Sequence, residues 1–393
     1  MDVTRRFAFT ARQAALLFLA VLLCACTATD QQKLARAILS DNPKAHLEGY
    51  LKSKGETYSQ SPGQLVSDLK TLDAGIKEFT AIIIAIWGKD HAAIAGRKKL
   101  VKYGHGYRSK AEVDFAKGLV TVETNAAKKP LTQLKQAIVT TLLTDDNPAH
   151  IDLYSDRAPI ISGRPYLFNQ VLDHDGQAIA YSWRANRFAD YLIKHRLKKT
   201  VRNKQQTYAV QIPMVGSHHQ LRRQKYAPYV LAAANKYQIK PELIYAIIET
   251  ESSFNPFAVS HANAYGLMQI VPATAGKDVY QKIRKKPGMP SRQTLFSARE
   301  NIDIGTAYLH ILSRQYLKNI RNSQSRHFAV ISAYNGGAGN VFKTFNSNRD
   351  HAKSRINTLL PEEVYRHLTT GHPKAESRRY LQKVTRAEKS YQL

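Results

Sequence analysis

Apolar residues recur at three- and four-residue spacing through much of the chain, which predicts amphipathic helices. Three such stretches in the first half cover residues 66–87, 131–143 and 188–197. Beyond Leu221 the same spacing predicts helices almost continuously. These cover residues 221–234, a segment that starts at Pro241, and residues 299–317, 328–340 and 361–367. The C-terminal half is therefore expected to be all helical.

Alternating apolar and polar residues predict strands in the first half. Val113 and Phe115 precede a Lys117-Gly118 turn, and residues 119–123 alternate after it, which favours a hairpin. Further strands are predicted over residues 150–154 and 208–214. The fold class is therefore α+β, with an N-terminal α+β accessory domain over residues 61–215 and an all-α domain over residues 216–393.

One acidic residue lies on the apolar face of a predicted helix. At 100° per residue, Glu251 falls about 20° from Ile244, between Ile247 and Ile248, whereas Glu249 points about 140° away. Burial disfavours a charged carboxyl, so the pKa of Glu251 is expected to rise towards values that suit a general acid near neutral pH. A structural glutamate paired with an arginine would fit the same position.

The residues after the acid predict a loop. Because the residue before a proline is pushed out of the helical region, Asn255-Pro256 is expected to stop the helix just beyond Glu251. The acid would then stand at the mouth of a loop, where a substrate could reach it.

Five blocks of residues follow one another over about 130 positions. They are Glu251-Ser252-x-Phe254-Asn255-Pro256, Gly266-Leu267-Met268-Gln269, Asn301-Ile302-x-x-Gly305-x-x-Tyr308-Leu309, Ala333-Tyr334-Asn335-Gly336-Gly337 and Glu376-Ser377-Arg378-Arg379-Tyr380. Together they resemble the catalytic domain of the lytic transglycosylases that share the lysozyme-like fold, enzymes that cut the glycan strands of peptidoglycan.

The N-terminal half shows a second likeness. It rests on Ile86-Trp87-Gly88, Lys102-Tyr103, Ile151-Asp152-Leu153-Tyr154-Ser155-Asp156 and Phe188-Ala189-Asp190-Tyr191-Leu192, and near the C-terminus on Leu368-Thr369-Thr370-x-His372-Pro373. These segments are similar to the membrane-bound lytic murein transglycosylase C family. The likeness covers nearly the whole chain beyond its first residues.

The resemblance implies cleavage of the β-1,4 bond between N-acetylmuramic acid and N-acetylglucosamine. A single glutamate serves in this family, which makes Glu251 the expected catalytic residue. It would protonate the bond and then take a proton from the muramoyl C6 hydroxyl, which attacks its own C1 to give a 1,6-anhydro sugar. The substrate supplies its own nucleophile, so neither water nor a cofactor or metal is expected.

The resemblance also supplies substrate-binding candidates. Ser260, nine residues after Glu251, is expected to hydrogen-bond the acid or the substrate acetamido group. Gln269 is expected to bind a sugar amide, although a buried capping amide is the other interpretation. The hydroxyl of Tyr334 is expected to reach Glu251. The remaining candidates are Met268, Asn335, Glu376 and Tyr380.

Two features modify this picture. An ion pair with Arg378 or Arg379 would suit Glu376 as well as a sugar contact would. Thr250 stands where many relatives carry glutamine, and bulky Tyr265 precedes Gly266, which puts the preference for particular sugar subsites in doubt.

The chain is strongly basic. It contains 58 Lys and Arg residues against 30 Asp and Glu residues, a net charge of +28, which favours an acidic partner. No zinc-ligand spacing, RNA-binding signature or helix-turn-helix pattern supports nucleic acid as that partner. The carboxylates of peptidoglycan and acidic lipid head groups remain as partners, and a solvated surface would also account for much of the charge. The sequence identifies no partner among the enzymes that act on the cell wall.

The first residues predict a lipoprotein. Residues 1–25 combine an arginine-containing start with an apolar run at 14–23 that is too short to span a bilayer, so they are predicted to be a signal peptide. Leu23-Cys24-Ala25-Cys26 resembles a bacterial lipobox with Cys26 as the acylated residue, and residues 26–60 would form the anchor and linker. Thr27 after the anchor favours an outer-membrane protein that faces the periplasm.

Two other functions stay open at this point. A lysozyme-like muramidase would need a second carboxylate beside Glu251, for which Asp278, Glu300 and Asp303 are the candidates. The chain could also be a non-catalytic peptidoglycan-binding lipoprotein that holds glycan without cutting it.

Overall fold

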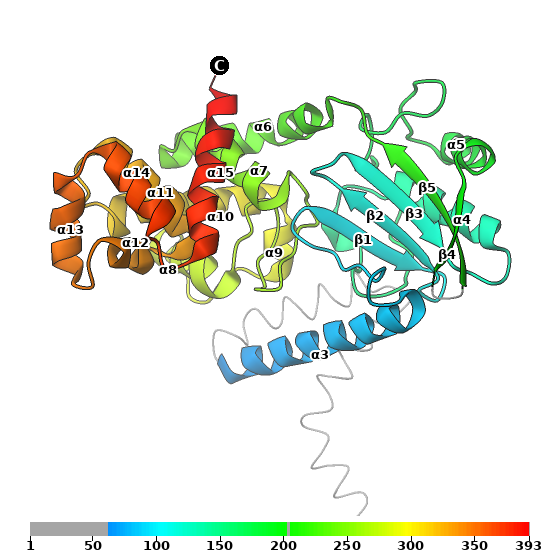
Figure 1. The fold of residues 1–393 in the computed structure, drawn as a ribbon, viewed down its shortest axis with the longest axis horizontal. Coiled ribbons are helices and arrows are strands. Elements are labelled where there is room, and N and C mark those ends of the chain that lie inside the picture. Colours follow the sequence, from blue (N-terminus) through cyan, green and yellow to red (C-terminus); the bar gives the residue numbers. More distant parts are fainter. Residues whose placement is uncertain (1–61, 203–204, 393) are drawn as a thin grey trace, which may run out of the picture. The chain divides into compact units, whose positions relative to one another are not determined.

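The computed structural model describes residues 62–202 and 205–392, so the predicted signal peptide, Cys26 and the linker lie outside the described residues. Residues 68–393 form one compact unit that holds both a sheet and a series of helices (Figure 1). This confirms the α+β prediction. The N-terminal elements are α3 (Pro62–Trp87), β1 (Lys99–Gly104), β2 (Ser109–Asp114), β3 (Leu119–Thr124), α4 (Pro130–Leu143), α5 (Ser182–His195), β4 (Lys198–Arg202) and β5 (Gln205–Pro213).

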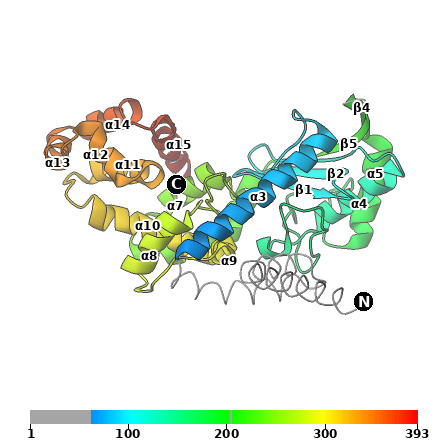
Figure 2. The ribbon, with the colours of Figure 1, turned by 90° about the horizontal axis from the view of Figure 1, so that it is seen from below.

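The five strands form one antiparallel sheet in the order β1-β2-β3-β5-β4. Helix α4 packs on its central strands, and Figures 1 and 2 place α5 beside α4. Leu134, Ile138 and Leu142 of α4 are spaced by four residues and are almost fully buried. They face the inward side chains of the sheet, such as Val113 and its cross-strand partner Val120.

The opposite face of β1 is covered by α3. Phe79, Ile83 and Trp87 recur at four-residue spacing and form a separate buried cluster with Val101 and Tyr103. Alternate residues of a strand point to opposite faces, so β1 contributes to two cores. This explains why a strand with two lysines in six residues is largely buried.

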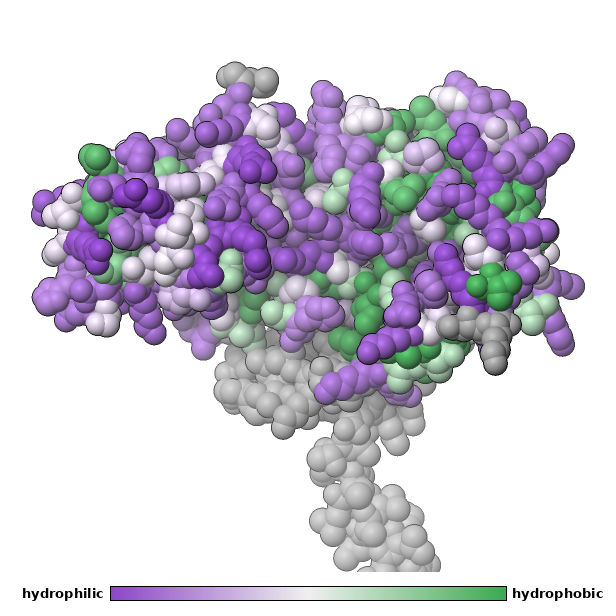
Figure 3. All heavy atoms as spheres, viewed as in Figure 1, coloured by the Kyte–Doolittle hydropathy of each residue, from purple (hydrophilic) through white to green (hydrophobic). Residues whose placement is uncertain are grey.

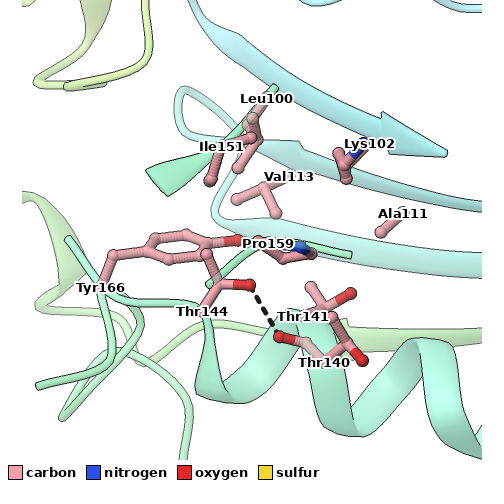
Figure 4. Close-up of a pocket in the computed structure, with 10 residues that line it drawn as sticks. All are labelled: Leu100, Lys102, Ala111, Val113, Thr140, Thr141, Thr144, Ile151, Pro159 and Tyr166. Atoms are coloured by element: carbon pink, nitrogen blue, oxygen red, sulfur yellow. Dashed lines mark hydrogen bonds between the residues drawn. The ribbon is translucent and has the colours of Figure 1, made fainter. Parts of the chain in front are cut away.

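A small hollow lies between β1, β2 and α4 (Figure 4). Its volume of about 20 Å³ has room for one water molecule. Lys102 lines it, and its Nζ donates a hydrogen bond to the carbonyl oxygen of Ser155 at 2.5 Å. Burial lowers the pKa of Lys102 to about 8. The hollow is too small for a sugar and belongs to the packing of the sheet.

The C-terminal part is helical, as predicted. Its elements are α6 (His218–Tyr237), α7 (Pro241–Ser252), α8 (Lys277–Lys282), α9 (Arg292–Phe296), α10 (Ala298–Ile311), α11 (Ser323–Gly336), α12 (Ala338–Phe345), α13 (Arg349–Thr358), α14 (Pro361–Thr370) and α15 (Ala375–Tyr391). Helix α7 packs against α6 and α15, and α15 also packs against α11. Six residues of α7, from Leu243 to Ile248, are buried in succession.

The predicted strand over residues 150–154 is wrong. The chain forms a short 3₁₀ helix at Pro148–His150 and then turns. Ile151 and Leu153 are buried while Asp152 is exposed, so the alternation is real. However, Asp145 Oδ2 lies 2.5 Å from His150 Nδ1, and its Oδ1 accepts the Asn147 amide. These local polar contacts hold the segment as a loop.

Several predicted helix limits also change. The helix expected at 188–197 begins six residues earlier, at Ser182, and ends at His195. The helix expected at 299–317 gives way to a π-helical turn at Leu312–Tyr316. The helix expected at 328–340 stops at Gly336, because Gly337 has a φ of 85° and separates α11 from α12.

The face seen in Figure 3 is mostly hydrophilic, with apolar patches scattered among the polar side chains. Among the helices that the structure describes, none has the length and apolar character needed to cross a bilayer.

Candidate functional site

The acid-bearing helix α7 begins with Pro241, whose fixed φ suits the first helical position. Ile244, Ile247 and Ile248 are fully buried, and Glu251 is only 5% exposed. The glutamate thus extends the apolar stripe of the helix, as the sequence predicted.

The helix ends abruptly after the acid. It stops at Ser252, and Ser253 and Phe254 both adopt the left-handed conformation with φ of 51° and 61°. The end thus comes before the Asn255-Pro256 pair that predicted it. Asn255 then stabilises the turn, since its Oδ1 accepts the Phe257 amide at 2.9 Å. The turn leaves Glu251 in the last helical turn.

The surroundings of Glu251 favour its protonated form. Burial raises its pKa from 4.5 to about 7. The guanidinium of Arg97 and the hydroxyl of Tyr380 lower the pKa, while the carboxylate of Glu376 raises it. A carboxyl with such a pKa can both donate and accept a proton near neutral pH.

Two tyrosines lie close to the acid. Tyr380 is 4% exposed, and its hydroxyl forms no hydrogen bond of regular geometry with the rest of the described chain, although it faces Glu251 closely enough to lower that pKa. The Tyr334 hydroxyl donates to the Met268 carbonyl oxygen at 2.9 Å instead of to Glu251. Burial, and then the Glu251 carboxylate, raise the pKa of Tyr334. Both phenols therefore stay protonated.

A loop that carries Gly266 to Gln269 is fastened to α10. Asn301 accepts the Met268 amide through Oδ1 at 2.8 Å and donates through Nδ2 to the carbonyl oxygens of Tyr265 and Leu295 at 2.8 Å. Gly266 has a φ of 74°, and a Cβ there would lie 2.3 Å from Asn301 Nδ2. Asn301 was not among the predicted site residues, although its block was recognised.

Three residues that were predicted to bind sugar, Ser260, Met268 and Gln269, differ in the contacts that their side chains make. Met268 is fully buried and its Sδ packs against Gly305, so it contributes backbone groups to the site. Gln269 donates through Nε2 to the Gly266 carbonyl oxygen at 3.0 Å, while its buried Oε1 has no partner in the described chain. The Nε2 group of Gln269 therefore acts as the buried capping amide that was the alternative interpretation, whereas its Oε1 remains available to a ligand. Ser260 accepts the Ala262 and Ala264 amides and so shapes its own loop.

The C-terminal helix α15 supplies the other predicted residues. Ser377 Oγ donates to Asn335 Oδ1 at 2.7 Å, which ties α15 to the end of α11. Gly336 permits this approach, because a Cβ there would lie 2.7 Å from Ser377 Oγ. Glu376 pairs neither with Arg378, which donates to the His372 carbonyl oxygen, nor with Arg379.

The partner of Glu376 comes from the N-terminal half. Arg97 Nη2 lies 3.4 Å from Glu376 Oε1, and its Nη1 lies 3.4 Å from Glu251 Oε2. The sequence suggested that a buried glutamate could pair with an arginine, but it contained no signal that selected Arg97. Glu251 thus has the arginine partner expected of a structural glutamate and also the raised pKa expected of a general acid.

The three other carboxylates considered for a hydrolase are engaged elsewhere. Asp303 accepts bonds from Lys236, Arg284 and Tyr237, and Glu300 shares Arg284. Asp278 accepts the hydroxyl of Tyr316. These partners hold all three acids as part of the surface network around α8 and α10.

A serine, histidine and aspartate also meet outside this site. Ser162 Oγ donates to Asp145 Oδ2 at 2.8 Å and lies 3.4 Å from His150 Nδ1, the same ring nitrogen that faces Asp145. A nucleophilic triad needs the serine and the aspartate on opposite ring nitrogens. The cluster therefore stabilises a loop. No group of metal-ligating side chains is present in residues 62–202 and 205–392.

Comparison with known proteins assigns the chain to a family. The family model for the N-terminal domain of membrane-bound lytic murein transglycosylase C matches residues 65–225, and that for the transglycosylase SLT domain matches residues 228–357. The chain is 48% identical over 328 residues to the membrane-bound lytic murein transglycosylase C of Serratia proteamaculans (strain 568), which covers 83% of this chain and 91% of that protein. The chain belongs to the membrane-bound lytic murein transglycosylase C family.

Other members of the family are equally similar. The membrane-bound lytic murein transglycosylase C of Klebsiella pneumoniae subsp. pneumoniae is 47% identical over 339 residues, covering 86% of this chain and 93% of that protein. Among solved structures, the 70 kDa soluble lytic transglycosylase of Escherichia coli matches 42% of this chain with 26% identity and a TM-score of 0.33. The chain spans about a quarter of the length of that protein, 24%.

Proposed function

We propose that Glu251 is the acid and base with which this lytic transglycosylase cleaves the β-1,4 bond between N-acetylmuramic acid and N-acetylglucosamine in peptidoglycan. The observation that carries the proposal is a carboxyl at the end of α7 that is buried and stands between Arg97 and Tyr380, where burial raises its pKa to about 7. Membership of the membrane-bound lytic murein transglycosylase C family supports the substrate and the type of reaction.

The proposed reaction needs two proton transfers by the same group. Glu251 first gives its proton to the glycosidic oxygen while the bond to the muramoyl C1 breaks. The resulting carboxylate then accepts the proton of the muramoyl C6 hydroxyl as O6 bonds to C1, which restores the acid. A pKa near the working pH suits both steps, because the protonated and ionised forms are then of similar free energy.

The surrounding residues can hold the sugar. The Oε1 of Gln269, which has no partner within the described chain, is an acceptor for an acetamido N–H. Glu376 and Tyr380 of α15 act on the acid, and Asn335 of α11 is tied to the same helix through Ser377. Ser260 keeps its hydroxyl hydrogen for a substrate oxygen, because its own Oγ accepts two backbone amides.

Replacement of the acid tests this assignment. Glu251→Gln is nearly isosteric but has no proton to donate at neutral pH, so it should abolish the release of soluble muropeptides from purified sacculi while the protein stays folded. Glu249→Gln is the matched control on the same helix. Its amide oxygen can still accept the hydroxyl of Tyr391, which lies 2.6 Å from Glu249 Oε2, so activity should change little. Substantial activity in a folded Glu251→Gln protein would reject Glu251 as the acid.

Isotope labelling distinguishes the lyase from a muramidase. Digestion in ¹⁸O-labelled water should leave the new muramoyl ends unlabelled, because the C6 hydroxyl closes the 1,6-anhydro ring. Labelled reducing ends would mean that water attacks C1. In that case a second carboxylate would be required, and Glu376 would join Asp278, Glu300 and Asp303 as a candidate.

We also propose that the mature chain is anchored to the outer membrane through a lipid on Cys26 and faces the periplasm. The proposal rests on the lipobox-like sequence before Cys26 and on Thr27 after it. The name of the related family, which includes the words membrane-bound, agrees with a membrane location.

A further inference from the structure

Arg97 reaches the acid from outside the transglycosylase domain. It stands two residues before β1, in the part of the chain that matches the N-terminal family domain at residues 65–225. Its two terminal nitrogens divide between two carboxylates, with Nη1 3.4 Å from Glu251 and Nη2 3.4 Å from Glu376. One guanidinium therefore bridges the end of α7 and the start of α15.

The backbone of Arg97 is fastened by the turn that ends α7. Asn255 Nδ2 lies 3.1 Å from the Arg97 carbonyl oxygen and 3.4 Å from that of Gly96. Asn255 is fully buried, and its Oδ1 is occupied by the Phe257 amide. The residue that shapes the loop after the acid thus also fixes where Arg97 enters. These hydrogen bonds restrain the backbone of Arg97 beside the acid.

Groups from three segments of the chain act on Glu251. Arg97 and Lys98 face it from the segment before β1, Glu376 and Tyr380 from α15, and Tyr334 from α11. Burial raises the pKa of Glu251 most strongly, Arg97 is the leading influence that lowers it, and Glu376 raises it. The Arg97 side chain is 44% exposed, so water screens its charge and its effect should be moderate.

We propose that Arg97 is a positioning residue of the transglycosylase reaction, which orients the carboxyl of Glu251 and supports its ionised form after the first proton transfer, while Glu376 limits this support by holding the other side of the guanidinium. The proposal rests on Glu251 being the acid and base proposed above. Without Arg97, the buried carboxylate of Glu251 would lose its cationic partner and be poorly stabilised. If Arg97 bound Glu251 alone, it would lower the pKa of Glu251 further. The carboxyl would then be ionised more often, and fewer molecules would hold the proton needed for the first transfer.

The test compares variants whose effects have opposite signs. In Arg97→Gln the pKa of Glu251 should rise by about 0.5 to 1 unit, because a partly screened positive charge is lost. Arg97→Lys keeps the charge without the bridging fork and should cause a smaller rise. Glu376→Gln removes the neighbouring negative charge and should lower the pKa. Arg187→Gln is the matched control, since Arg187 is 48% exposed and pairs with Asp175 at 2.6 Å.

Two measurements on the full chain report the pKa of Glu251. One is the ¹³C resonance of its side-chain carboxyl during a pH titration, assigned by its absence from Glu251→Gln. The other is the alkaline limb of muropeptide release, where activity falls as the acid ionises. Both should move upward in Arg97→Gln, downward in Glu376→Gln and not at all in Arg187→Gln.

An unchanged Glu251 titration in folded Arg97→Gln would overturn the proposal, as would shifts of the same sign in Arg97→Gln and Glu376→Gln. Failure of the proposed function looks different. In that case Glu251→Gln would remain active, while the carboxyl titration would still report whether Arg97 acts on Glu251.

Discussion

At the scale of single residues, the chemistry depends on where a carboxyl is placed. Glu249 and Glu251 are two residues apart on α7, yet Glu249 is half-buried and accepts the Tyr391 hydroxyl, whereas Glu251 is buried beside Arg97. The pKa of Glu251 therefore rises to about 7, mainly because burial disfavours the charged form. Ionisation of Glu251 in the folded protein should therefore lower the free energy of unfolding.

This consequence can be measured as a pH dependence of stability. In the unfolded chain Glu251 should ionise near 4.5, but in the folded protein only near 7, so between these values the folded state holds the extra proton. Stability should therefore fall as the pH rises through this window and level off above it. We expect Glu251→Gln to gain on the order of 3 kcal/mol relative to the original chain between pH 4.5 and pH 8, by urea unfolding. An equal gain in Glu249→Gln would contradict this explanation.

At the scale of elements, the site depends on close contacts between the loop at 266–269 and α10. Asn301 and Gly305 are four residues apart and therefore on one face of α10. Asn301 forms three hydrogen bonds with the loop and its neighbours. Gly305 leaves space for the Met268 side chain, since a Cβ at position 305 would lie 2.4 Å from the Met268 Sδ. These contacts hold the loop close against the helix.

Gly266→Ala should disturb this arrangement. The new Cβ would lie 2.3 Å from Asn301 Nδ2 and 2.4 Å from the Leu295 carbonyl oxygen, at a backbone φ of 74° that alanine disfavours. We expect a loss of about 2 to 4 kcal/mol in the free energy of unfolding, together with reduced activity. Gly339→Ala in α12 is the control, because a Cβ there meets nothing within 4 Å. Equal stability of the two variants would show that the loop can shift freely.

At the scale of the whole molecule, the N-terminal half contributes directly to the surroundings of the acid. Its sheet positions Arg97, and the buried Arg222 of α6 donates to the Phe115 carbonyl oxygen and to Gln170 Oε1, both at 2.7 Å. The ring of Tyr166 also packs edge-on against Phe257, with centroids 5.2 Å apart. These contacts join the sheet to the helices that carry the acid, which fits the single compact unit over residues 68–393.

Anchoring is tested on the same scale. If Cys26 is acylated, Cys26→Ala should move the protein from the outer-membrane fraction to the soluble periplasmic fraction, because the apolar run at 14–23 is too short to act as a mature membrane helix. The released protein should still digest isolated sacculi. Retention in the membrane would mean that the apolar segment stays uncleaved and serves as the anchor itself.

The sequence determined the parts of this protein that depend on local patterns. The period of apolar residues located several helices, among them α4, α6 and α7, and the β2–β3 hairpin. It also placed Glu251 on a buried face, because helical periodicity is written directly into the chain. The shorter helices α8, α9 and α13 and the strands β1 and β4 were not predicted. The five blocks identified the family, and the order of sheet and helices followed from the same patterns. Element ends were predicted less well, as at Gly337 and at residues 150–154, because contacts such as the one between Asp145 and His150 override propensity.

The tertiary structure decided which groups meet at the acid. Arg97 is 154 positions from Glu251 along the chain, and Glu376 is 125 positions away on the other side, so no local pattern connects them. The same holds for the direction of the Tyr334 hydroxyl, the burial of Met268 and the choice of Arg97 over Arg378 as the partner of Glu376. Side-chain partners across long separations follow from how the sheet and helices pack, and the energies that select them arise only once those elements are in contact.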